Sequence, residues 1–556
     1  MDQQHNAGRS KKFFLGAAIL AVSGLICKVI GAFYRIPLQN NILGLDGMSL
    51  YQLSYPVYSM LVVVSTSGLA TAISKMVAER VVHGDYQGAK RIFVISRNLL
   101  LGIGLSTMAI MLVGNRWITA IQGDPLANLV NLAIAPALFF VALLSAYRGY
   151  FQGMQEMTPT AVSQLLEQVF KLIFGFSLAT LGVRYGASFA ADAHNRSIQY
   201  GAAGAMLGVT VSEVIALGYM ILVYGRRRKK LRALEQAQTA PREERKTSGI
   251  IGRMLQLAIP VTLGAAVMPM VFYIDSAMVV NILTGAGTPL AEARSLYGLL
   301  SGPVNTLMNL PGVLTSALAM SLVPAISAAW ARKDHDDLNE KTGAGIRIAL
   351  MLGLPCSAGL FILAKQILTL LYASSVSDYM TQAVQLLQVI SVAVAFLSVV
   401  QSMTGVLQGT GKVLLPVRNL AIGAVCKVIV GWLLLRIPGV NILGAAVGTL
   451  VCFIVAGVLD MVSVLRITKA RISIVDTLLR PLAAAVGMAA AVWLMVFLLE
   501  GVIRNSILTA LAIAVGACVY FALLILTRAL SREDAQLVLG KRGRRLVKLL
   551  PTRRRK

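Results

Sequence analysis

The sequence predicts an all-α integral membrane protein with fourteen transmembrane helices, and three observations support this fold class. Of its 556 residues, 57% are hydrophobic and only 13% are charged, whereas soluble domains carry about 25% charged residues. The mean hydropathy is +0.73. One stretch of the first half recurs in the second half, and such a repeat predicts two related halves.

A transmembrane helix needs about 20 consecutive, mostly apolar residues, and fourteen stretches of the chain meet this requirement. The predicted spans are 13–37, 48–73, 92–114, 127–151, 159–183, 201–224, 254–283, 296–328, 342–371, 380–407, 413–435, 441–464, 478–499 and 505–527. Polar segments separate them, and the longest of these follows the sixth span.

The repeat joins the end of the fourth span to the fifth, and the end of the tenth to the eleventh. Gly149–Gly175 reads GYFQGMQEMTPTAVSQLLEQVFKLIFG, and Gly405–Gly431 reads GVLQGTGKVLLPVRNLAIGAVCKVIVG. The Gln-Gly, Lys and final Gly recur at the same spacing. Because the copies are six spans apart, both halves cross the membrane in the same direction. This predicts two six-helix lobes related by a pseudo-two-fold axis along the membrane normal, plus two C-terminal helices outside the repeat.

A second sign of duplication lies in the sixth span of each half. Gly204 and Gly208, and likewise Gly444 and Gly448, form G-x-x-x-G patterns that permit close helix contact. The predicted divisions are an N-terminal lobe at 1–225, a basic cytoplasmic linker at 226–250, a C-terminal lobe at 251–466, two further helices at 467–528 and a basic cytoplasmic tail at 529–556.

The formal net charge of +27 follows from membrane topology rather than from nucleic-acid binding. Most of the 51 Lys and Arg residues lie in alternate polar segments, and positive residues collect in cytoplasmic loops. This pattern places both termini and the 226–250 linker in the cytoplasm, with attraction to anionic membrane lipids as a secondary effect.

Charged residues inside the spans are the first candidates for function, because a mid-membrane charge costs about 2.5–3.5 kcal/mol. Lys28 and Arg35 share one helical stripe with Gly24 and Gly31. Two cations beside exposed backbone suit an anion, and the planar fork of arginine suits phosphate. Snorkelling to the interface is the alternative, and it fits Arg35 better than Lys28.

Polar residues of other spans extend this set of candidate substrate-binding residues. Gln52 is the candidate in the second span, on a face that also carries Tyr55, Ser59 and Thr66. Asp275, deep in the seventh span, suits a pair with Lys28 or Arg35, a coupling cation, or a structural ion pair. Asn305 and Asn309 suit sugar hydroxyls, although such polar faces also hold helices together.

Three further intramembrane charges are candidates for coupling or structure. Glu167 and Lys171 stand four residues apart in the favourable order for a helical ion pair, so we expect them to neutralise each other. Lys427, at the repeat position of Lys171, has no close acidic residue in its own helix and needs a partner or water.

The sequence gives little support to enzymatic, metal or nucleotide chemistry. There is no G-x-x-x-x-G-K-[ST] motif, the four histidines are scattered, and the five cysteines lie in spans without a C-x-x-C. The outer loops are short and poor in acidic residues and histidine. We expect no metal, no cofactor and no catalytic residues.

Several runs carry a family resemblance. ICKVIGAFYRIPL from Ile26, GMSLYQLSYPVYS from Gly47, STSGLATAISKMVAER from Ser65 and RGYFQGMQEMTPTAVSQLLEQ from Arg148 resemble the MurJ/SpoVB-type branch of the multidrug/oligosaccharidyl-lipid/polysaccharide (MOP) exporter superfamily. The resemblance covers nearly the whole chain. It implies a bacterial plasma-membrane flippase that moves undecaprenyl-diphosphate-linked cell-wall precursors, such as lipid II, outward by alternating access through a V-shaped cavity.

The resemblance also implies roles and partners. It implies that Lys28 and Arg35 contact the lipid diphosphate. It leaves open whether the substrate is linked to sporulation, and whether a coupling cation or the membrane potential drives transport. Cell-wall synthesis proteins are possible partners. One departure stands out: the second span carries Ser65, Thr66 and Ser67 but no arginine, unlike several MurJ proteins. The rival functions are a cation-coupled multidrug antiporter of the same superfamily and a polyprenyl-dependent glycosyltransferase.

Overall fold

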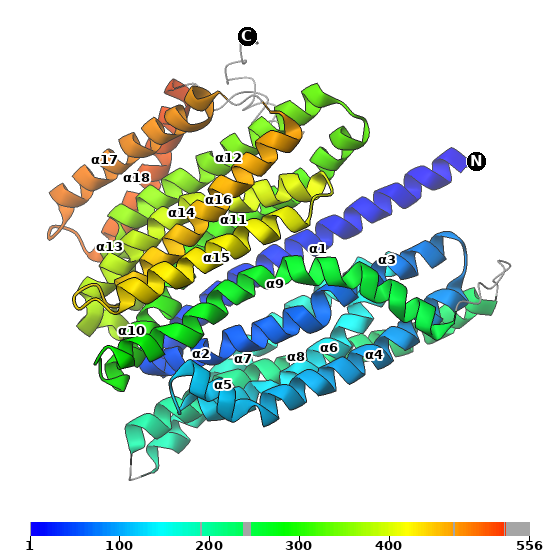
Figure 1. The fold of residues 1–556 in the computed structure, drawn as a ribbon, viewed down its shortest axis with the longest axis horizontal. Helices are drawn as coiled ribbons and strands as arrows, with labels where there is room; N and C mark the ends of the chain where they lie inside the picture. Colours follow the sequence, from blue (N-terminus) through cyan, green and yellow to red (C-terminus); the bar gives the residue numbers. More distant parts are fainter. Residues whose placement is uncertain (1, 190–191, 237–245, 471–472, 528, 530–556) are drawn as a thin grey trace. The chain divides into compact units, whose positions relative to one another are not determined.

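The computed structural model describes residues 2–189, 192–236, 246–470, 473–527 and 529 (Figure 1). Within these residues the regular elements are helices, apart from an isolated bridge between Glu500 and Ile503. The all-α membrane fold predicted from the composition is therefore confirmed. Except for its first residue, the predicted tail at 529–556 lies outside the described part of the chain.

The chain divides into two compact units, Met1–Gly302 and Pro303–Lys556, with the division inside η3 (Leu300–Val304). The other elements of the first unit are α1 (Asp2–Leu38), η1 (Gln39–Leu43), α2 (Gly44–Val62), η2 (Val63–Ser67), α3 (Gly68–Val82), α4 (Tyr86–Val113), α5 (Asn115–Gln122), α6 (Ala127–Gly153), α7 (Met157–Ala187), α8 (Ala193–Gln236), α9 (Thr247–Gly285) and α10 (Leu290–Leu299). Those of the second unit are α11 (Asn305–Ala331), α12 (His335–Ile362), α13 (Ala364–Val376), η4 (Ser377–Tyr379), α14 (Met380–Gly409), α15 (Leu414–Leu435), α16 (Leu443–Thr468), η5 (Val475–Leu479), α17 (Arg480–Leu499) and α18 (Asn505–Leu526).

Thirteen helical segments of the described residues are long and apolar enough to cross a membrane. The first, Val22–Val82, has 61 residues, which is enough for two crossings at about 20 residues each. It contains the turn at η1, where Gly44 takes a φ of 65°. The thirteen segments therefore account for the fourteen predicted spans. The division into lobes at 225 and 250 stays a prediction.

The repeated Gln-Gly turns make equivalent contacts in the two units. A Cβ atom on Gly153 of α6 would lie 2.6 Å from Cβ of Val77 of α3. One on Gly409 of α14 would lie 2.8 Å from Cβ of Ile326 of α11. A side chain at either glycine would therefore force the two helices apart, which explains why glycine stands at both repeat positions.

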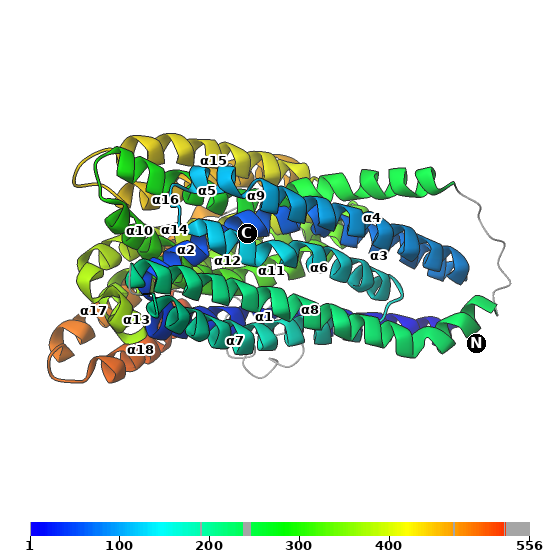
Figure 2. The same cartoon turned by 90° about the horizontal axis from the view of Figure 1, so that it is seen from below.

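The G-x-x-x-G patterns also contact the final glycine of each repeat. A Cβ atom on Gly208 of α8 would lie 2.5 Å from Cα of Gly175 of α7, and one on Gly448 of α16 would lie 3.5 Å from Cα of Gly431 of α15. Figures 1 and 2 show α7 and α8 running side by side along most of their length. The sequence repeat is thus also a repeat of tertiary contacts within each unit.

The predicted linker at 226–250 is partly helical, because α8 continues to Gln236 and α9 begins at Thr247. Its first part, RRRKKLRALEQ, consists of good helix formers. Two ion pairs hold this extension to its own unit: Arg227 pairs with Glu156, and the ammonium of Lys90 lies 2.7 Å from Glu235 Oε2.

A widened π-helical turn interrupts the second span at η2, whose sequence is VVSTS. Each hydroxyl donates to the backbone carbonyl four residues earlier: Ser65 to Leu61 at 2.6 Å, Thr66 to Val62 at 2.7 Å and Ser67 to Val63 at 2.7 Å. Hydroxyls that compete for helix carbonyls in this way distort the helix. The three hydroxyls therefore serve the backbone of their own helix.

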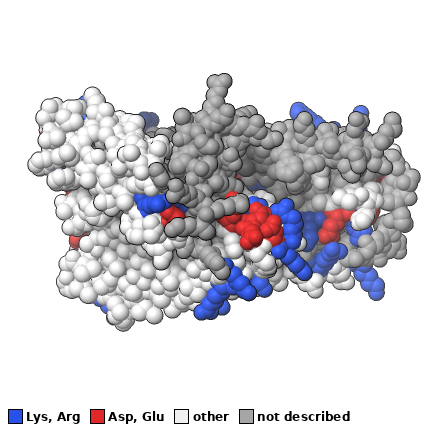
Figure 3. Space-filling model, turned by 90° about the horizontal axis from the view of Figure 1, so that it is seen from above, with Lys and Arg blue, Asp and Glu red and all other residues white. Residues whose placement is uncertain are grey.

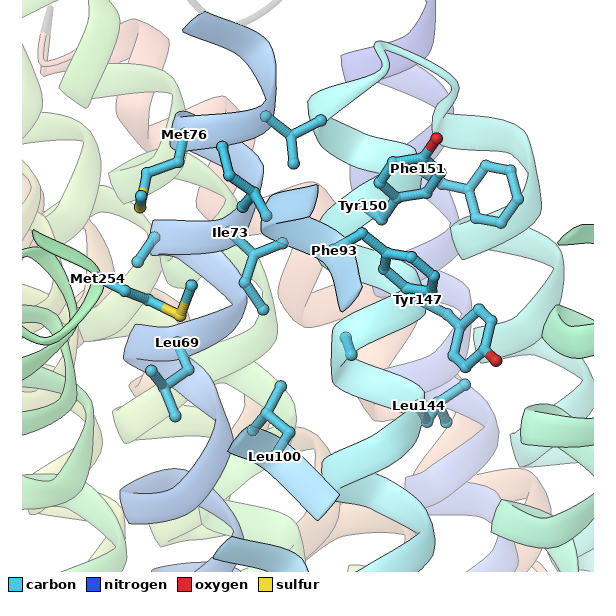
Figure 4. Packing of buried hydrophobic residues seen from close by; sticks show 14 of the residues in the cluster. Leu69, Ile73, Met76, Phe93, Leu100, Leu144, Tyr147, Tyr150, Phe151 and Met254 are labelled. Carbon is cyan, nitrogen blue, oxygen red and sulfur yellow. The ribbon is translucent and has the colours of Figure 1, made fainter. Parts of the chain in front are cut away.

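Aromatic residues organise the hydrophobic core of the first unit. The ring of Phe93 of α4 lies 5.1 Å from that of Tyr147 and 4.7 Å from that of Tyr150, both of α6, centroid to centroid (Figure 4). On the other side of this core, Figure 4 shows Met254 of α9 beside Leu69 of α3. This hydrophobic core packs α4, α6 and α9 against α3 within the first unit.

In the second unit, α17 and α18 pack on each other (Figures 1 and 2). Tyr520 of α18 joins them to α12 by donating its hydroxyl to the Met351 carbonyl at 2.8 Å. Trp493 and Phe497 of α17 stack with their ring centroids 5.5 Å apart, and both are exposed. Exposed stacked aromatics are expected where a helix faces lipid.

Charged side chains gather in patches of mixed sign, with broad uncharged surface beside them on the face shown in Figure 3. Ion pairs such as Arg332 with Asp337, at 2.7 Å, are consistent with this mixing. Exposed pairs of this kind contribute little stability. The charged residues that bear on function are those within the membrane-spanning parts of the helices.

Candidate functional site

Two cations of the first unit share one tyrosine ring. The guanidinium carbon of Arg35 of α1 lies 5.6 Å from the centroid of the Tyr55 ring of α2, and the ammonium of Lys171 of α7 lies 5.3 Å from the same centroid. The Lys171 ammonium is also 5.5 Å from the centroid of Tyr34. Such cation–π contacts contribute about 0.5–1 kcal/mol each when exposed and about 2 when desolvated.

Local sequence positions these groups. Tyr34 is buried against Phe176 of α7, with ring centroids 5.2 Å apart, and its hydroxyl would collide with a Cβ atom on Gly175. Because Gly175 leaves room for Tyr34, α1 approaches α7 closely, and Arg35, the next residue, reaches Tyr55. The half-buried state of Arg35, Tyr55 and Lys171 leaves part of each side chain accessible to a ligand.

Three tyrosines of α2 form a continuous row on one helix face. Tyr51 and Tyr58 lie four residues before and three residues after Tyr55, and their ring centroids are 5.7 Å and 5.9 Å from that of Tyr55. Tyr51 and Tyr58 are buried, and the Tyr51 hydroxyl is within hydrogen-bonding reach of Lys171. The row gives Lys171 an aromatic and hydroxyl-bearing surface inside the membrane.

Lys28 lies on the same face of α1 as Arg35, seven residues earlier, which corresponds to about 10 Å along the helix. Its side chain is exposed in the structure. Nearby positions of this face contact α7: Ser23 donates to Gln164 at 3.3 Å, and a Cβ atom on Gly31 would meet Gln168 at 3.7 Å. The predicted stripe therefore exists, and Arg35 is the cation of this stripe that lies over Tyr55.

Within the described residues, the direct ion pair of Glu167 is with Arg148 rather than with Lys171, so the mutual neutralisation of Glu167 and Lys171 stays a prediction. Glu167 Oε2 accepts from Nη2 of Arg148 of α6 at 2.9 Å, while Lys171 lies against the tyrosines. Arg148 is fixed further by donating from Nε to the Ser163 hydroxyl at 2.9 Å. A guanidinium that reaches across the Gln-Gly turn offers this directed contact, and the tyrosine row draws Lys171 away.

Sequence reasoning missed Arg148 and Glu213 as parts of this site. Glu213 of α8 is only 5% exposed and lies within hydrogen-bonding reach of Glu167. An acidic residue inside the apolar sixth span was the signal that would have found it. Arg148 stood at the end of a span, where an arginine indicates topology.

Gln52 and Asp275 each interact with Tyr297 of α10. The Gln52 amide donates to the Ser301 carbonyl at 2.6 Å, and the Tyr297 hydroxyl donates to the Gln52 carbonyl at 3.1 Å. Asp275 of α9 is buried and interacts electrostatically with Tyr297. Gln52 thus ties α2 to α10 and η3, and its amide is already occupied.

A buried ion pair ties α10 to the segment before α6. Arg294 Nε lies 2.5 Å from Asp124 Oδ2, and its Nη1 donates to Asn195 at 3.3 Å. The neighbouring Ser295 donates to Asp46 at 2.5 Å. Together with Gln52 and Tyr297, these contacts hold the α10 end of the first unit.

The remaining candidates lie in the second unit. Asn309 donates to the Asn305 carbonyl at 2.8 Å within α11, and both side chains are half-buried. Lys427 of α15 is 2% exposed. None of the three is placed relative to the tyrosine row, because that row belongs to the other unit.

The described residues contain no group of three or more His, Cys, Asp or Glu that could hold a metal ion. The arrangement suits binding rather than bond making. Arg35 and Lys171 supply two positive charges, Tyr55 supplies a ring, and the surrounding helices supply a low-dielectric wall that strengthens attraction to an anion.

Comparison with known proteins gives two family matches. The model described as polysaccharide biosynthesis protein matches residues 14–330, and the MatE model matches residues 302–433. Among curated relatives, stage V sporulation protein B of Bacillus subtilis (strain 168) is 27% identical over 83% of this chain and 85% of its own length. Lipid II flippase MurJ of the same organism is 24% identical over 92% of this chain and 94% of its own length.

Solved structures show a similar fold. Lipid II flippase MurJ in an inward closed conformation matches with a TM-score of 0.67 and 14% identity, over 92% of this chain and 98% of that one. An inward-facing multidrug resistance MATE family transporter of the MOP superfamily matches with a TM-score of 0.63 and 16% identity, over 80% of this chain and 94% of that one.

Proposed function

Because the chain belongs to the polysaccharide biosynthesis protein family and is a flippase or transporter of the MOP superfamily, we propose that it flips a polyprenyl-diphosphate-linked oligosaccharide, such as lipid II or a related cell-wall precursor. Transport runs from the inner to the outer leaflet by alternating access. The observation that carries this proposal is the placement of Arg35 and Lys171 on the same Tyr55 ring inside the membrane.

The chemistry of this site fits a diphosphate. Two cations neutralise part of its charge, and the Arg35 fork is suited to bidentate contact with phosphate oxygens. The same anion repays the cost of holding two cations in apolar surroundings. Lys28, about two turns from Arg35 on α1, extends positive charge along the path of the head group.

Sugar and ion contacts complete the proposal. Asn305 and Asn309 supply amide groups for sugar hydroxyls, and Asp275 and Lys427 adjust the charge of the transport path. Membrane lipids surround the helices. The proposal also includes a coupling cation or the membrane potential as the energy source. It further includes proteins of cell-wall synthesis as partners. Both termini are placed in the cytoplasm by the distribution of Lys and Arg.

The second candidate is a cation-coupled multidrug antiporter, favoured by the MatE match at residues 302–433. A tyrosine row attracts organic cations, but Arg35 and Lys171 repel them. Reconstituted vesicles distinguish the two candidates. The flippase proposal predicts that labelled lipid II changes leaflet and that cationic dyes do not move. Dye efflux without lipid movement would favour the antiporter.

Rescue in cells tests the physiological role. A bacterial host depleted of its own lipid II flippase should grow when this chain is supplied. Failure of rescue, together with flipping of another lipid-linked oligosaccharide in vesicles, would assign a different glycan. A chain that moves no polyprenyl diphosphate in either assay would contradict the proposal.

A further inference from the structure

Two carboxyl groups meet in the interior of the first unit, close to the proposed anion site. Glu213 of α8 is 5% exposed, and its carboxyl group lies within hydrogen-bonding reach of that of Glu167 of α7. Within the described residues, Glu213 Oε2 has no hydrogen-bond partner. A carboxyl that is this deeply buried is costly unless its charge is paired or removed.

The hydrogen-bond inventory of the pair requires a proton. An ionised carboxylate only accepts hydrogen bonds, so two carboxyl groups bond to each other only when one carries a proton. Arg148 binds Glu167 Oε2 at 2.9 Å, and the Gln168 amide donates to Glu167 Oε1 at 3.2 Å. Both oxygens of Glu167 thus receive donors that favour its ionised form, and the proton falls to Glu213.

Every neighbouring helix contributes to the charge balance. Among the described residues, the charged and titratable groups beside the pair are Lys171 of α7, Arg148 of α6, Tyr58 of α2 and, next to Glu167, the Cys27 thiol of α1. Tyr58 is a buried neutral phenol. Lys171 lies against Tyr34 and Tyr55 rather than on a carboxylate. Among these groups, Arg148 makes the direct ion pair with Glu167, at 2.9 Å.

We propose that Glu213 and Glu167 form a proton-binding site that sets the affinity of the Arg35–Lys171 site for an anionic diphosphate. This inference rests on the proposed function. Glu167 and Lys171 stand four residues apart on α7, about 6 Å along the axis. A proton on the pair removes one negative charge beside Lys171 and leaves its positive charge available to the ligand.

The linkage works in both directions. If protonation tightens binding of the diphosphate, binding of the diphosphate must promote protonation by the same factor. The separation of about one helical turn and the low local dielectric favour an effect on the order of tenfold, within the usual range of coupling between sites. The ligand of the carboxyl pair is a proton rather than a metal ion, because Arg148 already occupies Glu167 and too few oxygens remain for a metal.

Infrared difference spectroscopy of the full-length protein tests the protonation itself. Spectra between mildly acidic and mildly alkaline buffer should contain the C=O stretch of a buried carboxylic acid, with its shift in D2O. Glu213→Gln should remove this band. Glu235→Gln, the same change on the same helix but in a pair with Lys90, should keep it. A band unchanged in Glu213→Gln would overturn the proton site, whatever the transport substrate.

Binding of undecaprenyl diphosphate to the protein in nanodiscs tests the linkage. Because the diphosphate itself titrates, the decisive quantity is the difference between the wild type and Glu213→Gln. The wild type should lose roughly tenfold more affinity than Glu213→Gln as the pH rises, and Glu235→Gln should follow the wild type. Equal pH dependence in the wild type and Glu213→Gln would overturn the linkage.

Two further outcomes also decide the matter. An affinity that follows the sodium concentration at constant pH, and loses this dependence in Glu213→Gln, would overturn the proton in favour of a metal cation. If no variant binds undecaprenyl diphosphate at any pH, the proposed function and the linkage both fail. The infrared band then still decides whether the carboxyl pair holds a proton.

Discussion

Lys171 lies over the ring of Tyr55, 5.3 Å from its centroid, although Glu167 stands one helical turn away on the same face of α7. The ammonium is thereby held between aromatic rings, and within the described residues it makes no direct ion pair with a carboxylate. In this arrangement an incoming anion does not first have to break an ion pair of Lys171. This relationship motivates the first two predictions.

Removing either central cation should abolish most transport. We expect Arg35→Ala and Lys171→Ala each to lower lipid flipping by about tenfold or more, because a charge-assisted contact contributes about 1.5–3 kcal/mol. Arg35→Lys should be partly active, since it keeps the charge and loses the fork, and Lys28→Ala should also reduce flipping. The measurement is leaflet accessibility of labelled lipid II in vesicles. Lys365→Ala, in an exposed pair with Glu500, is the control. Normal flipping by the Arg35→Ala/Lys171→Ala double variant would contradict the cationic site.

The ring of Tyr55 should matter more than its hydroxyl. Tyr55→Phe keeps the aromatic face under Arg35 and Lys171, so we expect transport close to that of the wild type. Tyr55→Leu removes the face, worth about 0.5–2 kcal/mol for each cation, and should lower transport several-fold. The same vesicle assay compares the two variants. Equal activity of Tyr55→Leu and Tyr55→Phe would show that the ring does not position the cations.

Loss of Arg148 should destabilise the protein through Glu167. Arg148→Ala leaves the Glu167 carboxylate without its charged donor, and we expect a cost of about 1.5–3 kcal/mol. Arg332→Ala removes an exposed partner of Asp337 and should cost at most about 1 kcal/mol. The readout is the thermal unfolding midpoint of the purified protein. Adding Glu167→Gln to Arg148→Ala should restore part of the loss, and an absence of rescue would argue against an electrostatic cause.

Two glycines of α8 should respond differently to one methyl group. The Cβ atom of Gly208→Ala would lie 2.5 Å from Gly175 Cα, whereas that of Gly218→Ala would meet no atom within 4 Å. Gly208→Ala should therefore separate α7 from α8, with a cost of about 1–3 kcal/mol for overpacking. Gly218→Ala should leave the unfolding midpoint unchanged or slightly raised. Equal midpoints for the two variants would contradict this helix contact.

The predicted orientation in the membrane rests on the distribution of Lys and Arg and needs its own test. In a background without the five native cysteines, Thr239→Cys should resist an impermeant thiol reagent in intact cells, and Asp192→Cys should react. Thr239 lies outside the described residues, and Asp192 is exposed. Labelling of Thr239→Cys from outside would reverse the predicted orientation.

The sequence alone determined the membrane fold, its spans and the internal repeat. Long apolar runs specify helices in lipid because each backbone group must be satisfied within its own segment. This local requirement can be read along the chain. The repeated Gln-Gly turns and G-x-x-x-G patterns likewise predicted close helix contacts, which the structure shows at Gly153 and Gly409, and at Gly208 and Gly448. The cost of intramembrane charge also drew attention to Arg35 and Lys171, which the structure brings together over Tyr55.

Only the tertiary structure decided which groups meet. Helical periodicity relates only residues of the same helix, so it predicted a pair of Lys171 with Glu167. It contains no information on the contacts between helices, in which Tyr34 and Tyr55 contact the Lys171 ammonium and Arg148 binds the Glu167 carboxylate. Contacts between helices depend on which side chains the packing of glycines brings within reach. Glu213 and Glu167 are the clearest case. The two residues are 46 positions apart in the sequence, and their carboxyl groups come together only because α7 and α8 pack closely.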